Sequence, residues 1–138
     1  IFIPEIAMES ATNFCKFSEE GWIDGGRCSS TGADRKDSPS YIVTNYIEVQ
    51  NGDIVYIKNL HTTDVHYSGL YKTDKTEISG FVVSASGSEG FIKDVELSKH
   101  LEQFTIDNTD VGYIRLCGMP EDNEKDIVIC IYRNGEWL

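Results

Sequence analysis

Residues 41–58 have the sequence YIVTNYIEVQNGDIVYIK. The first half, residues 41–49, is rich in β-branched and aromatic residues, which favour strands. Gln50-Asn51-Gly52-Asp53 follows, and an Asn-Gly step between two such runs is a strong signal for a hairpin turn. Residues 54–58 then supply a second strand-forming run. The sequence therefore predicts a β-hairpin in which residues 54–58 return along residues 41–49.

The rest of the chain also consists mainly of short strand-like runs. They lie at residues 65–71, 81–83, 104–106, 112–116 and 126–132, and turn-forming residues separate them. Short strands with regular turn signals indicate an all-β fold, here a jelly-roll-like antiparallel β-sandwich. At most one short helix is expected, near residues 94–103, where apolar residues fall at a helical spacing. We expect residues 1–36 to be a lead-in segment (a strand or linker plus a Gly/Ser-rich loop) and residues 37–138 to form the sandwich module.

The composition narrows the class of partner. The chain has 138 residues, a formal net charge of −11 and 40% hydrophobic residues. A domain of this length can bury a sizeable core without a metal or a disulfide. The excess of acidic residues argues against nucleic acid or an anionic membrane as the main partner, because both are bound mainly through Lys and Arg. No apolar run approaches the roughly 20 residues that span a bilayer, so no membrane insertion is expected.

The four cysteines are Cys15, Cys28, Cys117 and Cys130, and no two of them are spaced as C-x-x-C. A zinc ribbon or a redox pair is therefore disfavoured. Cys117 and Cys130 lie in apolar runs, where a cysteine behaves as a small buried hydrophobe. Cys15 and Cys28 flank a loop-like stretch, so a disulfide between them is possible in an oxidising compartment, and the sequence leaves that alternative open.

Residues that could carry catalysis or hold a metal ion are sparse. His61, Asp64 and His66 are the best metal candidates, but a polar edge strand explains them better, since they match no known ligand spacing. The Gly/Ser-rich residues 86–90 do not form a nucleophile elbow. Residues 107–110 could offer oxygen ligands to calcium, although a tight turn explains them equally well. We therefore expect no catalytic residue, no metal and no cofactor.

Aromatic residues are the more suggestive set. The chain has seven tyrosines and two tryptophans, whose flat amphipathic rings can stack on sugars or anchor an interface. Trp22 lies in a glycine-rich stretch and Trp137 near the end of the sequence, while Tyr67 and Tyr71 fall on one face of a predicted strand. We take these four as candidate carbohydrate-binding residues. The alternative is that they belong to a half-buried core face.

The order of the motifs resembles a known module. Residues 46–59, YIEVQNGDIVYIKN, are followed by Leu70-Tyr71, by Phe104-Thr105-Ile106, by Tyr113-Ile114-Arg115-Leu116 and by residues 127–131. This series is similar to a β-sandwich module of bacteriophage and prophage tail-fibre, tail-spike and baseplate proteins. The resemblance covers roughly residues 38 to 132. The four cysteines and the first 36 residues have no counterpart in the pattern.

The resemblance implies a non-catalytic structural and receptor-binding module located in the virion tail or outside the cell. It implies a homo-oligomer, a trimer, with other virion proteins as partners and bacterial surface carbohydrate as ligand. The alternative is a monomeric carbohydrate-binding module of a secreted polysaccharide-degrading enzyme, which shares the sandwich and the aromatic platform. A small enzyme is the third hypothesis and would need a pocket with convergent titratable groups.

Overall fold

The computed structural model describes residues 7–15, 22–24, 27–28, 34–35, 42–61, 68–81, 101–120 and 127–138. These residues form short strands, and every strand pair among them is antiparallel, which confirms the all-β prediction. The strands are β1 (Trp22–Asp24), β2 (Arg27–Cys28), β3 (Asp34–Arg35), β4 (Ile42–Thr44), β5 (Ile47–Glu48), β6 (Ile54–Lys58), β7 (Leu60–His61), β8 (Ser68–Tyr71), β9 (Glu77–Phe81), β10 (Leu101–Thr105), β11 (Tyr113–Arg115), β12 (Cys117–Pro120), β13 (Val128–Arg133) and β14 (Glu136–Trp137).

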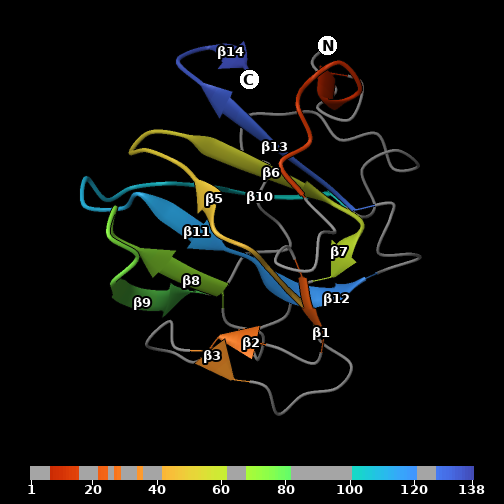
Figure 1. The fold of residues 1–138 in the computed structure, drawn as a ribbon. Coiled ribbons are helices and arrows are strands. Elements are labelled where there is room, and N and C mark those ends of the chain that lie inside the picture. The colour runs from red at the N-terminus through yellow and green to blue at the C-terminus, as the bar shows by residue number, and fades with distance from the viewer. Residues whose placement is uncertain are drawn as a thin grey trace.

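Most of the strands make two layers, whereas β2 and β3 form a separate two-stranded sheet (Figure 1). The first layer is a sheet of order β10-β6-β13-β14, and the second contains a sheet of order β5-β11-β8-β9. A further sheet, β1-β4-β12-β7, continues the second layer, because β4 and β5 are consecutive and pair with the consecutive strands β12 and β11. At the bend the Thr44 amide donates to the Leu116 carbonyl at 2.9 Å, and the Leu116 amide donates to Thr44 Oγ1 at 3.0 Å.

The turn at Asn51–Gly52 is present, but the predicted hairpin pairing is wrong. Gly52 has φ 91° and the Asp53 amide donates to the Gln50 carbonyl at 3.1 Å, as a tight turn requires. Yet β5 pairs with β11, while β6 pairs with β10 and β13. The turn therefore connects the two layers instead of closing a hairpin within one sheet. Each half of the stretch buries one of its faces in the same core. The residues of β5 enter that core from the second layer and those of β6 from the first layer.

The predicted short helix near residues 94–103 is wrong for the part that the structure describes. Residues 101–103 belong to β10, which pairs with β6 over five residues, from Leu101 opposite Lys58 to Thr105 opposite Ile54. A ladder of backbone hydrogen bonds to a neighbouring strand overrides a weak local periodicity. Residues 94–100 lie outside the described residues.

One turn at the N-terminal end is closed by the Ser10 amide, which donates to the Ala7 carbonyl at 3.3 Å.

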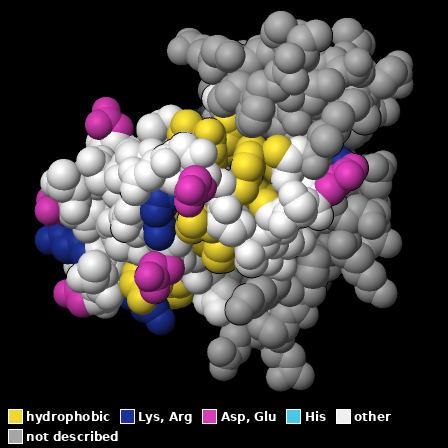
Figure 2. Space-filling model, turned by 90° about the horizontal axis from the view of Figure 1, so that it is seen from above, with side chains coloured by type: hydrophobic (Ala, Val, Ile, Leu, Met, Phe, Trp, Pro, Cys, Tyr) yellow, Lys and Arg dark blue, Asp and Glu magenta, His cyan; other side chains and the backbone are white. Residues whose placement is uncertain are grey.

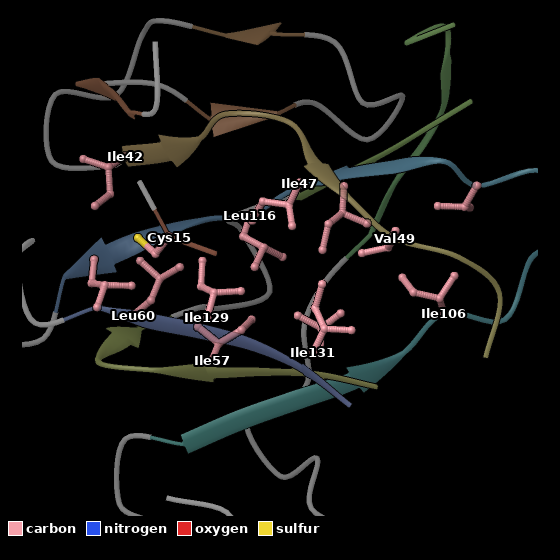
Figure 3. Close-up of a cluster of buried hydrophobic side chains, with 14 residues drawn as sticks. Cys15, Ile42, Ile47, Val49, Ile57, Leu60, Ile106, Leu116, Ile129 and Ile131 are labelled. Atoms are coloured by element: carbon pink, nitrogen blue, oxygen red, sulfur yellow. The ribbon is translucent and has the colours of Figure 1, made fainter. Parts of the chain in front are cut away.

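The core lies between the two layers (Figure 3). Ile57, Ile129 and Ile131 point inward from β6 and β13, and each has 0% exposed surface. Ile47 and Leu116 meet them from the second layer. This packing follows from strand alternation, because every second residue of β6 and β13 faces the same side of the sheet.

Residues before position 36 contact both layers. The Phe14 amide donates to the Ile129 carbonyl at 2.7 Å, and the Thr12 amide donates to the Leu138 carbonyl at 2.8 Å. Asn13 Oδ1 accepts from the Ile129 amide at 2.9 Å. β1 pairs with β4 in the second layer. Part of the expected lead-in segment thus runs along β13, and Cys15 joins the core cluster.

Candidate functional site

The structure separates the four aromatic residues singled out in the sequence. Trp22 begins β1, opposite Thr44, and its side chain lies outside what the structure describes, as does all of Tyr67. Tyr71 ends β8 and only 1% of it is exposed, so its ring offers no face to an external sugar. That ring folds back over Gly69, where an added Cβ would lie 2.7 Å from Tyr71 Cε2. Trp137 is half-buried in β14.

Trp137 belongs to a second apolar cluster on the outer face of the first layer. Its ring stacks on Tyr132 (centroids 5.1 Å apart, planes at 18°) and lies 4.9 Å from the Tyr56 ring. Met8 of the N-terminal turn and Cys130 pack into the same cluster. Burial raises the pKa of the Tyr56 hydroxyl, and the nearby Tyr132 adds to that rise. Since two rings already contact Trp137, its main role in this structure is packing.

Figure 2 views the molecule from the end where β14 and the N-terminal turn lie. Hydrophobic side chains gather in a band on the described part of this face, with acidic and basic side chains beside it. The face has apolar character without being fully exposed, because Tyr132 and Trp137 are each half-buried. Neither Tyr132 nor Trp137 lines the two hollows that are described below.

A better candidate site lies on the outer face of the second layer. Alternation along β5 and β11 sends Ile47 and Ile114 into the core and leaves their neighbours on the opposite face. In register, Glu48 lies opposite Tyr113, which in turn lies opposite Tyr71. Tyr46 precedes β5 on the same face. Three tyrosines from three segments thus meet on one surface.

The rings of these tyrosines meet edge to face. Tyr46 and Tyr71 have centroids 4.9 Å apart with planes at 73°, and Tyr46 and Tyr113 have centroids 6.1 Å apart with planes at 83°. Edge-to-face contact is favourable because the positive edge of one ring meets the negative face of another. Tyr71 is the buried support of the group, whereas Tyr46 and Tyr113 are half-buried and reach the surface.

Two cations lie against these rings. Lys75 Nζ lies 4.9 Å from the Tyr46 centroid and 5.5 Å from the Tyr113 centroid. Arg115 Cζ lies 5.1 Å from the Tyr46 centroid. Arg115 is buried, and its Nε donates to the Thr44 carbonyl at 2.9 Å, so this cation is fixed within the sheet. Lys75 is exposed. All three distances fall within the range of a cation–π contact.

Lys75 is held over the rings by the turn between β8 and β9. The Lys75 amide donates to the Lys72 carbonyl at 2.8 Å, and Lys75 itself has φ 67°. Asp74 Oδ1 accepts from the Thr76 amide at 2.9 Å. A hydrogen bond with the Thr76 side chain is the main cause that lowers the pKa of Asp74, and the bond from the Thr76 amide adds to that effect. The carboxylate therefore stays ionised and supports the turn.

A hollow of about 310 Å³ opens beside the two tyrosines at β5, which is the end strand of its sheet among the described residues. It is lined by Phe14, Thr44, Asn45, Tyr46, Ile47, Glu48 and Tyr113. Asn45 Oδ1 accepts from the Tyr46 amide at 2.8 Å, so the Nδ2 group is the part of this side chain that can donate to a ligand. Glu48 is exposed and supplies an acceptor. The lining thus combines two rings, one amide and one carboxylate.

A second hollow, of about 260 Å³, has a different character. It is lined mainly by Leu70, Phe81, Phe104, Ile106 and Val111, with Thr105, Asp107 and Asn108 at its side. Phe81 and Phe104 have centroids 4.8 Å apart. Apolar linings favour hydrocarbon groups over hydroxyl-rich ligands, so this hollow is the weaker candidate for a sugar.

Among the described residues, no group of three or more His, Cys, Asp and Glu side chains could hold a metal ion. The side chain of His61, in β7, and all of Asp64 and His66 lie outside that part of the chain. The turn at residues 107–110 is closed by the Asp110 amide on Asn108 Oδ1 at 2.8 Å. In the part of the chain with described placement, no helix has the length and hydrophobicity needed to cross a membrane.

Cys117 and Cys130 are both completely buried, as predicted, and Cys15 is 7% exposed. Cys130 Sγ lies 3.9 Å from the Met8 carbonyl, and burial raises the pKa of its thiol to about 11. Cys15, Cys117 and Cys130 are not in disulfides in this structure, so the Cys15–Cys28 bridge that the sequence left open is not formed.

Comparison of the chain with protein-family models, with curated proteins and with solved structures gives no match.

Sequence reasoning missed Tyr46 and Tyr113 as site residues. A signal for both was present, because each precedes an inward-facing isoleucine, and alternation places it on the outer face. What the sequence lacked was the pairing of β5 with β11, which sets Glu48 opposite Tyr113.

Proposed function

We propose that this chain is a non-catalytic carbohydrate-binding module whose ligand enters the hollow beside Tyr46 and Tyr113. The observation that carries the proposal is the lining of that hollow, in which two half-buried tyrosine rings stand next to Asn45 and Glu48. Rings of this kind pack on the apolar faces of a sugar, while amide and carboxylate groups take its hydroxyls. A hollow of about 310 Å³ lies at the lower end of the range for small-ligand sites.

We further propose that the module belongs to a phage or prophage tail fibre, tail spike or baseplate. The support is the motif order described above together with an antiparallel all-β fold in two layers. In this proposal the fold is a jelly-roll-like sandwich and the protein acts in the virion tail or outside the cell. Its partners are other copies, as a homotrimer, other virion proteins, and the carbohydrate of a bacterial surface.

Binding is tested with a glycan array, followed by calorimetry on the best ligands. Replacing one ring by an aliphatic side chain, Tyr46→Leu or Tyr113→Leu, is expected to weaken binding roughly 3- to 10-fold, the value of one aromatic contact. Tyr46→Phe keeps the ring and serves as the matched control. An array without hits, or Leu variants that bind as well as the original protein, would contradict the proposal.

The assembly is tested separately by light scattering at micromolar concentration. A trimer supports the tail-protein proposal. A monomer that still binds glycan favours the alternative, a carbohydrate-binding module fused to a polysaccharide-degrading enzyme, and the neighbouring reading frames would then encode or adjoin a catalytic domain.

A further inference from the structure

We propose that the Tyr46–Tyr113 pocket selects glycans that carry a positively charged amino group. This inference rests on the proposed function and adds the chemical class of the ligand. Its basis is that the protein already places an ammonium group against the same two rings.

That ammonium group belongs to Lys75. Its Nζ lies within 5.5 Å of both ring centroids, and the rings meet at 83°. Two aromatic faces at nearly a right angle form a corner, and both faces present negative charge from the ring quadrupole. Such a corner attracts Lys, Arg or a ligand cation, and it is the arrangement by which proteins recognise organic ammonium ions. The contact with Lys75 shows that the two rings can share a single cation.

Glu48 adds a full negative charge to the same pocket. It lies opposite Tyr113 in the pairing of β5 with β11, it is exposed, and it lines the hollow. A ligand ammonium can therefore contact an aromatic ring and a carboxylate together. The net charge of −11 also attracts a cationic glycan over a longer range.

Arg115 opposes the binding of a cationic ligand, whereas Glu48 favours it. Its Cζ lies 5.1 Å from the Tyr46 centroid, and a fixed cation there weakens the attraction of that ring for a second cation. Arg115 is buried, its Nε donates to the Thr44 carbonyl, and its guanidinium contacts the Tyr46 ring. We therefore assign the larger share of cation binding to Tyr113 and Glu48.

Lys75 does not line the hollow, but its Nζ lies against both rings, so a ligand ammonium that contacts the same corner would have to displace it. Lys75 is exposed and lies in a turn where its φ of 67° suits asparagine as well as lysine. Lys75→Asn removes the internal ammonium without adding strain to the turn. This variant should bind a cationic glycan about 2- to 5-fold more tightly, because the ligand no longer displaces a tethered competitor.

The experiment compares two ligands with one backbone, the tetramer of β-1,4-linked glucosamine and its fully N-acetylated form, by calorimetry at pH 6. At this pH exposed carboxylates are ionised. We expect the amine form to bind roughly 10-fold more tightly, the value of a cation–π contact with a nearby carboxylate. Glu48→Gln should remove most of that preference, because it should weaken binding of the amine form much more than binding of the acetylated form. Glu136→Gln, on β14, makes the same charge change away from the pocket and is the matched control.

The outcomes separate the two proposals. The cation preference is overturned if both tetramers bind with equal affinity and both shift the NMR signals of Tyr46 and Tyr113. The carbohydrate proposal then still stands. If neither tetramer binds and tetramethylammonium shifts neither tyrosine signal, the cation preference fails, and the array result decides the carbohydrate proposal. Tetramethylammonium that shifts both tyrosine signals, more strongly in Lys75→Asn, supports the cation preference by itself.

Discussion

Arg133 and Asp53 form a two-contact ion pair across 80 positions of the chain, with Nε–Oδ1 and Nη2–Oδ2 distances of 2.8 Å each. Asp53 has 1% of its side chain exposed and Arg133 28%. Asp53 Oδ2 also accepts from the Gln50 amide at 2.9 Å. The pair joins the turn between the layers to the end of β13. The hydrogen bond with Asp53 raises the pKa of the Arg133 guanidinium above its ordinary value.

Asp53→Asn should destabilise the protein. The variant loses the buried negative charge that holds Arg133, and one of its two side-chain acceptors becomes a donor facing the guanidinium. We expect the free energy of unfolding to fall by about 2 kcal/mol, the scale of a hydrogen bond to a charged group. Urea denaturation measures this. Glu136→Gln, an exposed acid next to the same strand end, is the control and should change stability by less than about 0.5 kcal/mol. Equal effects of the two changes would remove the structural role assigned to Asp53.

Ile129 should be among the most sensitive positions in the core. It is fully buried between the layers, so its truncation leaves a cavity. Ile129→Val should cost about 1 kcal/mol and Ile129→Ala about 2–5 kcal/mol in unfolding free energy. Thr109→Ala, in an exposed turn, is the comparison and should be close to neutral. An Ile129→Ala variant as stable as the original protein would mean that the two layers do not close on this residue.

Alanine substitutions at Gly112 and Gly52 should both destabilise the protein, for different physical reasons. A Cβ added at Gly112 would lie 2.8 Å from Thr73 Cα and 2.9 Å from its backbone nitrogen. Gly112→Ala therefore forces the β8–β9 turn away from β11, at about 1–3 kcal/mol. A Cβ at Gly52 meets nothing within 4 Å, but φ of 91° strains any other residue, so Gly52→Ala should cost about 1 kcal/mol.

These two variants differ in their effect on the pocket as well as on stability. Gly112→Ala should also shift the NMR signals of Lys75 and Tyr113, because Lys75 belongs to the displaced turn. Gly52→Ala should leave both signals in place. Identical spectra for the two variants would contradict the tight packing of Gly112 on Thr73.

Stability should fall at alkaline pH. The pKa of the Cys130 thiol is about 11 in the folded protein against 9.0 for an ordinary thiol. Between these values the unfolded chain gives up the proton and the folded protein keeps it, so rising pH favours unfolding. The loss begins near pH 9, is complete near pH 11 and is on the order of 1–3 kcal/mol. Tyr56, whose pKa is also raised, extends the same trend to higher pH.

Urea denaturation at pH 8, 9.5 and 10.5 measures this fall, and Cys130→Ala should flatten it while lowering stability at every pH. Alkylation at pH 8 gives a second readout, because peptides containing Cys117 or Cys130 should stay unmodified until the protein is denatured. Modification of either cysteine in the native protein at the rate seen in urea would contradict their burial.

The sequence could predict which residues of the candidate site face outward, but it could not predict that they lie together. The alternation that sends Ile47 and Ile114 inward also places Tyr46 and Tyr113 outward, and that is visible in the sequence. Tyr71 shows the limit of such reasoning. It lies on the same outer face, yet neighbouring rings cover it, and its exposed fraction of 1% depends on residues far away in the chain.

The sequence by itself determined that the fold consists of short strands, that the chain turns at Asn51–Gly52, and that Cys117 and Cys130 are buried. These features depend on neighbouring residues, on backbone sterics and on the period of two along a strand. Only the tertiary structure decided that β5 pairs with β11 instead of β6, and that Asp53 meets Arg133. A tight turn reverses the chain but does not choose which edge the returning strand joins. That choice follows from burying apolar faces from both layers at once, which involves every strand together.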